Sequence, residues 1–323
     1  MTETDSTGDE TGHTDLLLRC AQLYYEADNT QQEIAKKLHL TRWKVGRLLA
    51  EARESGLVRI EIVHPAARQK AEEQALCERF GLRGAAVVPE NAAGDEQELL
   101  SAVGRSAAQF LSDLSPVPKL LGVSWGRTMD AVARWMTPGW ANGVHVVQLN
   151  GSMRVSRTPN GAPELAARIA SAGAGRVSLL PVPAIVDEPT TRQALEQDSS
   201  VSGVLDLASH AGVVIFGLGA LGVDSVLVES GYLSADDISG LGAAGAVGDA
   251  LGRFITADGS LADPSLDERT LGVDLDVLTS IHTRIAVAAG PRKHQVVRAA
   301  LRRGLCTALV TDAGTAKFLL EQP

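Results

Sequence analysis

Four short segments place hydrogen-bond donors and acceptors beside glycine, in a way that suits contact with a small polar ligand. In the first, Gly122–Thr128, the glycines let backbone amides approach an anion, and the helix expected to follow would begin with free N–H groups. Ser124, Arg127 and Thr128 add side-chain donors. This combination predicts capture of a phosphate group, and the alternative is a plain strand-to-helix turn.

The other three segments carry groups that suit sugar hydroxyls or a phosphate. Gln148–Ser152 has two side-chain amides, and in Gly248–Phe254 the Asp249 carboxylate could accept from vicinal hydroxyls. In Gly290–Lys293, proline would begin a helix and the lysine suits a phosphate. Each segment could be only a turn or a cap, but together they favour a phosphosugar-type pocket. The predicted ligand contacts are Gly122, Ser124, Trp125, Gly126, Arg127, Thr128, Gln148, Asn150, Gly151, Gly217, Gly219, Asp249, Arg253 and Lys293.

The run Gly217–Gly222 matches the glycine pattern of a dinucleotide site, G-x-G-x-x-G. Such a site also needs a helix and then a strand that ends in an acidic residue about 20 positions further on. Here the chain continues into the polar run Ser234–Ile238, which predicts the start of a second helix. We therefore expect no nicotinamide cofactor, and we expect Gly217 and Gly219 to bring the backbone close to a sugar.

A second kind of chemistry lies near the start of the chain. Residues 31–53 hold six lysines or arginines against two glutamates, although the whole chain carries a formal net charge of −9. A short basic island in an acidic protein favours one localised element that faces DNA. Arginine can read guanine with two parallel hydrogen bonds, while lysine and threonine can hold phosphates.

The pattern around this island predicts a winged helix-turn-helix. Thr30 and Glu33 form a capping box, and Thr41 suits the N-cap of the next helix, whose first turn would face the bases. The alternative is a solvated basic face, and Trp43 could also pack on its own domain or on a neighbour. The expected elements are a helix over Asp15–Ala27, a short helix from Thr30 to Leu38, a recognition helix from Thr41 to Ser55 capped by Gly56, and a wing strand over Leu57–Val63. The predicted DNA contacts are Thr30, Gln31, Thr41, Arg42, Trp43, Lys44 and Arg47.

Beyond Pro65 a connecting helix is expected over Ala67–Phe80, followed by short apolar runs that alternate with helical stretches. This alternation predicts an α/β fold with an open, mostly parallel sheet, in which ligands bind beyond the carboxyl ends of the strands. The predicted strands are Ala85–Val88, Leu120–Val123, Val144–Leu149, Val177–Leu180, Val213–Phe216, Ile285–Ala289 and Ala308–Val310.

Composition excludes several other classes. The cysteines, Cys20, Cys77 and Cys306, are far apart, which argues against a disulfide framework or a zinc site and for the reducing cytoplasm. No apolar run reaches the ~20 residues that span a bilayer. The predicted organisation is a disordered acidic tail over residues 1–13, a winged helix-turn-helix over 14–64, and a linker helix with an effector-binding and oligomerisation domain over 65–323.

These motifs, in this order, resemble the SorC/DeoR-type family of bacterial sugar-responsive regulators. Leu40–Arg42 and Val45–Leu49, with Ala52 and Arg53, are similar to that family's helix-turn-helix. The segments similar to its effector domain are Gly122–Thr128, Gln148–Gly151, Gly248–Phe254, Arg284–Gly290 with Lys293, and Ala300–Gly304 with Leu309–Asp312.

The resemblance implies a domain similar to sugar-phosphate isomerases and deaminases that is used for sensing. It also implies dimers or tetramers that bind palindromic operators in double-stranded DNA under the control of a sugar, polyol or sugar phosphate. The ligand contacts that it carries over are Ser124, Thr128, Gln148, Asp249 and Lys293. Two departures stand out: Gly46 replaces a serine that is common in the family, and Gln148–Gly151 has no lysine for a Schiff base.

The alternative function is a sugar-phosphate isomerase or deaminase. It would need a general base near the substrate, for which Asp249 or Asp224 could serve. Neither has an evident acid partner, and the histidines are scattered along the chain. An enzyme that consumed its own signal would also defeat a DNA-binding sensor, so we predict no catalytic residue and no metal or cofactor.

Overall fold

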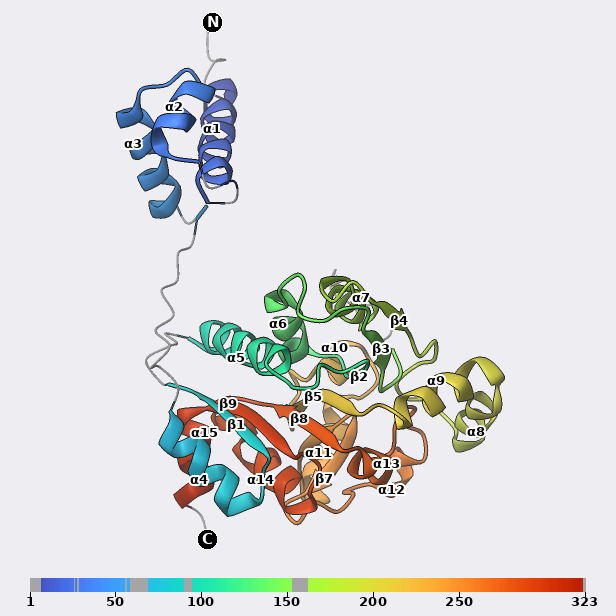
Figure 1. Cartoon of the computed structure of the whole chain (residues 1–323). Coiled ribbons are helices and arrows are strands. Elements are labelled where there is room, and N and C mark those ends of the chain that lie inside the picture. Colours follow the sequence, from blue (N-terminus) through green and yellow to red (C-terminus); the bar gives the residue numbers. More distant parts are fainter. Residues whose placement is uncertain are drawn as a thin grey trace, which may run out of the picture. The chain divides into compact units, whose positions relative to one another are not determined.

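The computed structural model describes residues 7–25, 27, 29–55, 57–58, 69–89, 95–152 and 162–321. The chain divides into two compact units, Met1–Pro65 and Ala66–Pro323 (Figure 1).

The first unit contains three helices, α1 (Thr7–Tyr25), α2 (Gln31–Lys37) and α3 (Arg42–Glu54). The capping box is present, since the Thr30 hydroxyl accepts from the Glu33 amide at 3.3 Å and the Glu33 carboxylate accepts from the Thr30 amide at 2.8 Å. Thr41 caps α3 by accepting from the Lys44 amide at 3.2 Å. The apolar faces of α1, α2 and α3 meet in one core, which is formed by Leu17, Cys20, Ile34, Ala35, Val45, Leu48, Leu49 and Ala52. The helix-turn-helix elements and their buried face are thus confirmed.

The start of the first helix differs from the prediction. Helix α1 begins at Thr7 and not at Asp15, so it extends over residues 7–13 of the segment predicted to be a tail. One contact that the sequence did not indicate joins this segment to α3, where the His13 Nε2 lies 2.6 Å from the Glu51 Oε1. Residues 1–6, the cap Gly56 and residues 59–63 of the predicted wing lie outside the described residues, and Leu57 and Val58 are in a bend.

The second unit begins with α4 (Lys70–Phe80) and is built on one mixed sheet. Seven strands lie in the order β1-β9-β8-β5-β2-β3-β4, and each neighbouring pair is parallel. All seven predicted strands are therefore confirmed. They are β1 (Gly84–Val88), β2 (Leu120–Val123), β3 (His145–Gln148), β4 (Arg176–Ser178), β5 (Val213–Ala220), β8 (Thr283–Val287) and β9 (Ala308–Asp312).

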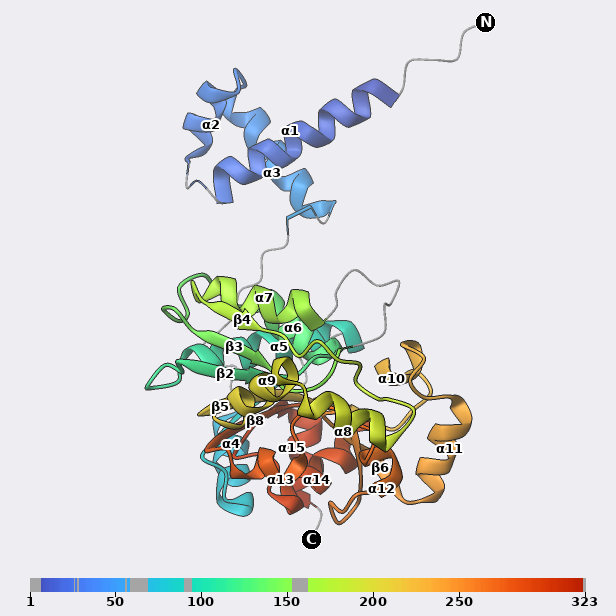
Figure 2. The same cartoon turned by 90° about the vertical axis from the view of Figure 1, so that its right-hand side faces the viewer.

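Helices cover both faces of this sheet (Figures 1 and 2). The side chains of a strand point alternately to opposite faces, so Val214 and Phe216 join the core beneath α4, α14 and α15, whereas Ile215 joins the core beneath α5, α6 and α7. The helices are α5 (Glu96–Ser112), α6 (Arg127–Trp135), α7 (Ala162–Ala172), α8 (Pro189–Gln197), α9 (Ser199–Ser209), α10 (Val226–Glu229), α11 (Ala235–Ala243), α12 (Pro264–Asp267), α13 (Leu275–Ser280), a 3₁₀ turn (Pro291–Lys293), α14 (His294–Arg303) and α15 (Ala313–Glu321). No described helix combines the length and the apolar character needed to cross a membrane.

The segment predicted as a loop over Gly248–Phe254 is instead an antiparallel hairpin. It consists of β6 (Ala246–Ala250) and β7 (Arg253–Thr256), and β6 pairs with the end of β5. Consequently Gly217 and Gly219 lie within a strand, not in a phosphate-binding turn. The predicted second helix start is confirmed as α11, where Ser234 and Asp237 form a capping box.

Candidate functional site

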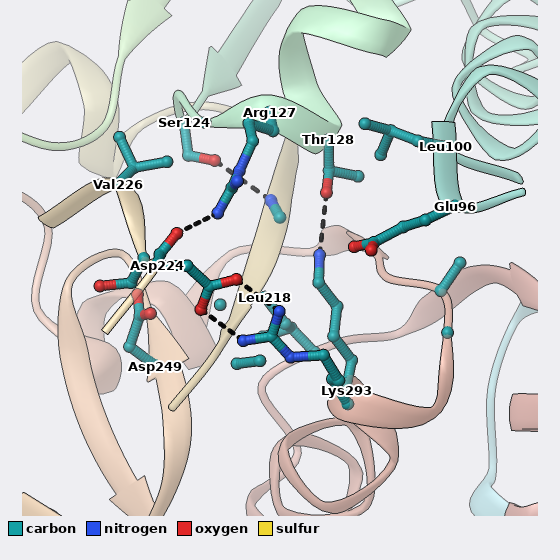
Figure 3. Close-up of a pocket in the computed structure, with 18 of the residues that line it drawn as sticks. Glu96, Leu100, Ser124, Arg127, Thr128, Leu218, Asp224, Val226, Asp249 and Lys293 are labelled. Atoms are coloured by element: carbon teal, nitrogen blue, oxygen red, sulfur yellow. Dashed lines mark hydrogen bonds and ion pairs between the residues drawn. The ribbon is translucent and has the colours of Figure 1, made fainter. Parts of the chain in front are cut away.

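A cavity of about 510 Å³ lies at the carboxyl ends of the central parallel strands. Its walls come from the segments that follow β2 and β8, from the end of β5, from the β6–β7 hairpin and from the start of α5. Ten of the predicted ligand contacts line it: Ser124, Trp125, Gly126, Arg127, Thr128, Asn150, Gly217, Gly219, Asp249 and Lys293. Figure 3 labels five of them, Ser124, Arg127, Thr128, Asp249 and Lys293. Chain folding thus brings together residues that are separated by up to 169 positions.

Lys293 supplies a cation inside this cavity. It ends the 3₁₀ turn after β8, and its Nζ donates to the Thr128 hydroxyl at 2.9 Å. Figure 3 shows the Glu96 carboxylate beside this amine. Burial lowers the pKa of Lys293 to about 8, and the negative charge of Asp249 opposes that shift. The amine is therefore available both as a cation and as a hydrogen-bond donor near neutral pH.

Asp249 supplies the acceptor on the opposite wall. Strand β6 pairs it with Gly219 of β5, and a Cβ at that glycine would lie 1.9 Å from the Asp249 Oδ1. The glycine is thus required so that the carboxylate can lie over β5. The Gly252 amide donates to Oδ2 at 3.0 Å, but burial outweighs this bond and raises the pKa of Asp249 to about 6. A half-buried carboxylate on a cavity wall suits hydroxyl groups that donate to it.

The beginning of α6 forms a third wall. Its N-cap, Gly126, has a φ of 127°, which favours glycine, and a glycine has no side chain with which to cap the first-turn amides. These amides and the helix dipole make this end suitable for an anion. The adjacent Ser124 hydroxyl accepts from the Gly217 amide at 3.2 Å, which joins this wall to β5.

An ion pair that the sequence did not predict closes the cavity on another side. Arg292 donates to both Asp224 carboxylate oxygens at 2.5 Å, and these bonds lower the pKa of Asp224 to about 2. Arg127 donates to the Asp224 carbonyl. Arg292 belongs to the predicted donor segment Gly290–Lys293, whereas the sequence indicates Asp224 only as a possible base in the alternative enzyme. No local pattern indicated that the loop after β5 would meet the segment after β8.

Three further predicted ligand contacts do not line the cavity. Gly122 lies against Leu149 and Val214, where a Cβ would clash with both. Gly151 lies so close to Pro183 that a Cβ would be 2.3 Å from its carbonyl oxygen. The buried Gln148 donates to the Asn150 carbonyl at 2.6 Å. These residues position the backbone around the cavity and do not face into it.

Arg253 is the fourth predicted ligand contact that does not line the cavity. Only 2% of the residue is exposed, and its guanidinium contacts the carboxylates of Asp267 and Asp274, the latter at 2.6 Å. It also donates to backbone carbonyls, including that of Thr270 at 3.3 Å. With its donors used within the protein, Arg253 has a structural role.

Of the seven predicted DNA contacts in the first unit, two cap helices, four line a hollow, and Lys44 is half-buried on α3 and does not line that hollow. Thr30 and Thr41 are engaged as helix caps. Gln31, Arg42, Trp43 and Arg47, together with Gly46, line a shallow hollow, and we call these five residues the reading face. Trp43 is 71% exposed, so it does not pack into its own unit. Within the described part of the chain, no group of three potential metal ligands was found.

Comparison with known proteins agrees with both parts of the chain. The family model Sugar-bind, described as "Putative sugar-binding domain", matches residues 64–321. The "Deoxyribonucleoside regulator" of Bacillus subtilis is 31% identical over 306 residues, which cover 95% of this chain and 97% of that protein. The "Transcriptional regulator LsrR" of Klebsiella pneumoniae subsp. pneumoniae is 33% identical and covers 95% of this chain and 93% of its own length.

A solved structure also matches the whole chain. The full-length sorbitol operon regulator SorC from Klebsiella pneumoniae has a TM-score of 0.72 and 27% sequence identity. The match covers 99% of this chain and 100% of that one. These matched proteins carry the names of regulators, not of enzymes.

Proposed function

Because this chain belongs to the SorC/DeoR-type family of sugar-binding transcriptional regulators, we propose that its cavity binds the small molecule that controls it. The ligand class is a small sugar, a polyol or a sugar phosphate. The isomerase or deaminase alternative has no support among the relatives. The division into a DNA-binding part over residues 14–64 and an effector-binding part over 65–323 belongs to the same proposal.

The observation that carries the proposal is that the Lys293 amine and the Asp249 carboxylate line the same cavity. The carboxylate can accept from vicinal hydroxyls, and the amine can donate to a hydroxyl or a phosphate. The uncapped start of α6 and Arg127 lie on the same cavity and suit the phosphate of a phosphorylated ligand. The volume of about 510 Å³ lies within the ordinary range for small-molecule sites.

For DNA, the support is the exposed face of α3. Arg42, Trp43 and Arg47 point away from a core that is complete without them, and α3 follows α2 as the second helix of a helix-turn-helix. A recognition helix of this kind enters the major groove. We further propose that the chain forms a dimer or tetramer on a palindromic operator in the cytoplasm, because two-fold paired motifs bind two-fold symmetric sites.

Ligand-induced stabilisation of the full chain tests the proposed site. Pentoses, hexoses, the corresponding polyols and their phosphates are compared by thermal shift, and the stabilising compound is measured by calorimetry. In Lys293→Met we expect roughly a tenfold to hundredfold weaker affinity, because a hydrogen bond to a charged group is lost.

The matched control is Lys317→Met, which removes the same charge from an exposed position on α15. Its affinity should equal that of the unaltered chain. The site assignment is wrong if Lys293→Met keeps full affinity, and the sugar-class proposal is wrong if no member of the panel stabilises the chain.

A further inference from the structure

The exposed indole of Trp43 differs from every other apolar side chain of α3. Val45, Leu48, Leu49 and Ala52 are buried, whereas Trp43 is 71% exposed. An isolated exposed hydrophobic residue means little by itself. The neighbouring residues Arg47 and Gly46 of the reading face indicate that the exposed indole contacts a partner.

Arg47 lies one helical turn after Trp43, and its guanidinium carbon is 5.3 Å from the centroid of the indole ring. This spacing of four residues places both side chains on one face of the helix. The cation–π contact keeps the guanidinium alongside the aromatic surface. The apolar indole of Trp43 and the planar guanidinium of Arg47 therefore lie side by side on α3.

Gly46 keeps the floor of the hollow open. Its φ is not among the positive values of the chain, so the backbone does not require glycine at this position. A Cβ there would lie 3.6 Å from the Gln31 Oε1, which means that any longer side chain would enter the hollow. Glycine is a poor residue for a helix interior, so an open floor is the feature that it provides here.

The side chains around this hollow complement groups that thymine and guanine present in the DNA major groove. Thymine presents a 5-methyl group there, and guanine presents two acceptors, N7 and O6, that a guanidinium can bind together. The Trp43 indole offers an apolar surface for the thymine methyl group, and the Arg47 guanidinium offers donors for the two guanine acceptors. Arg42 on its rim adds the positive charge that favours a duplex over an apolar protein surface.

We propose that Trp43 and Arg47 read a thymine and its neighbouring guanine as a unit, with the thymine methyl against the indole and the guanine bound by Arg47. This inference rests on the proposed function, since it requires α3 to enter the major groove. Trp43 is then a specificity-determining residue, and the open floor at Gly46 lets the methyl group enter.

The test begins with selection of duplexes from a randomised library by the full-length chain, followed by affinity measurements on the preferred duplex. Each thymine is then replaced by deoxyuridine, which removes only the methyl group. At one thymine per half-site, we expect roughly threefold to fourfold weaker binding, the effect of one buried methyl group. In Trp43→Ala the same replacement should have no effect.

Other variants sharpen the assignment. Arg47→Ala should reduce discrimination at the adjacent guanine by roughly fivefold to a hundredfold. Trp43→Phe should keep part of the methyl preference, and Gly46→Ser should weaken it by filling the hollow. The matched control is Leu18→Ala, an exposed apolar residue on α1 that should change nothing.

The outcomes separate this inference from the proposed function. If the unaltered chain selects no duplex, DNA binding itself is wrong. If it selects a duplex but Trp43→Ala retains the deoxyuridine penalty, only the reading of thymine by Trp43 is wrong. The inference is also overturned if Trp43→Ala changes the oligomeric state in light scattering, because Trp43 would then contact a second copy of the chain.

Discussion

The reading face and the cavity use similar side chains in opposite surroundings. Residues of the reading face fall within 17 consecutive positions, and Trp43 and the arginines there project into solvent. The cavity collects residues from 95 to 312, and its amine and carboxylate are half-buried there, which shifts their pKa values. Charged side chains on the reading face lower the stability of the fold little, because water solvates them. In the cavity, burial of charge opposes folding unless neighbouring groups or a ligand offset it.

The largest expected effect concerns the exposed region. Arg42→Ala combined with Arg47→Ala should weaken binding to the selected duplex by about a hundredfold or more, because two base or phosphate contacts are lost. Unfolding and ligand-induced stabilisation should stay unchanged. Fluorescence anisotropy measures the affinity for the duplex. Thermal shift measures unfolding and ligand-induced stabilisation.

Arg19→Ala provides the control, since it removes one positive charge from the exposed surface of α1. A double variant that still binds the selected duplex with normal affinity would show that α3 is not the recognition helix.

A comparably large effect should appear in stability when the buried arginine is removed. Arg253→Met removes the ion-pair partner of Asp267 and the donor to the Thr270 carbonyl, while Asp274 keeps its ion pair with Arg192. The combined loss of these charged hydrogen bonds should cost about 3–5 kcal/mol. Urea unfolding of the full chain measures this change. Arg302→Met, on the exposed side of α14, should have little effect, and equal stability of the two variants would contradict the structural role of Arg253.

A smaller effect with a distinctive pH dependence is expected at Asp249. Its pKa rises from 3.8 to about 6 in the folded chain, so the native state binds more protons than the unfolded state between these values. Stability therefore falls as pH rises through this window, and the loss is complete above about pH 6. Asp249→Asn should remove that loss and stabilise the chain at pH 7 by up to roughly 3 kcal/mol, with no gain near pH 4.

Thermal unfolding between pH 4 and pH 8 measures this difference, and the exposed Asp206→Asn serves as the control. A gain in stability that is the same at every pH would show that the Asp249 carboxylate is not desolvated. The same variant should bind the ligand more weakly, so stability and affinity would change in opposite directions.

Sequence reasoning succeeded where the signals are local. The capping box at Thr30, the N-cap Thr41 and the seven apolar runs predicted helices and strands that the structure contains. It failed where distant segments decide the outcome. The β6–β7 hairpin depends on pairing with β5, and the Asp224–Arg292 contact joins residues 68 positions apart.

Arg253 and Lys293 show that local sequence also fails to predict which basic side chains face the cavity. Both are cations in glycine-flanked segments, and nothing in their immediate sequence distinguishes them. Folding directs Arg253 to two carboxylates on α12 and before α13, while Lys293 extends to Thr128 at the cavity. The fold class and most of the cavity could thus be predicted, but which charges face a ligand could not.

The central claim is that occupancy of the cavity controls DNA binding, and linkage tests it directly. The affinity of the full-length chain for its selected duplex is measured with and without a saturating amount of the stabilising sugar-class compound. We predict a change of about fivefold or more, in either direction, that disappears in Lys293→Met. Equal duplex affinity in the presence and absence of a compound that demonstrably binds the cavity would contradict the account.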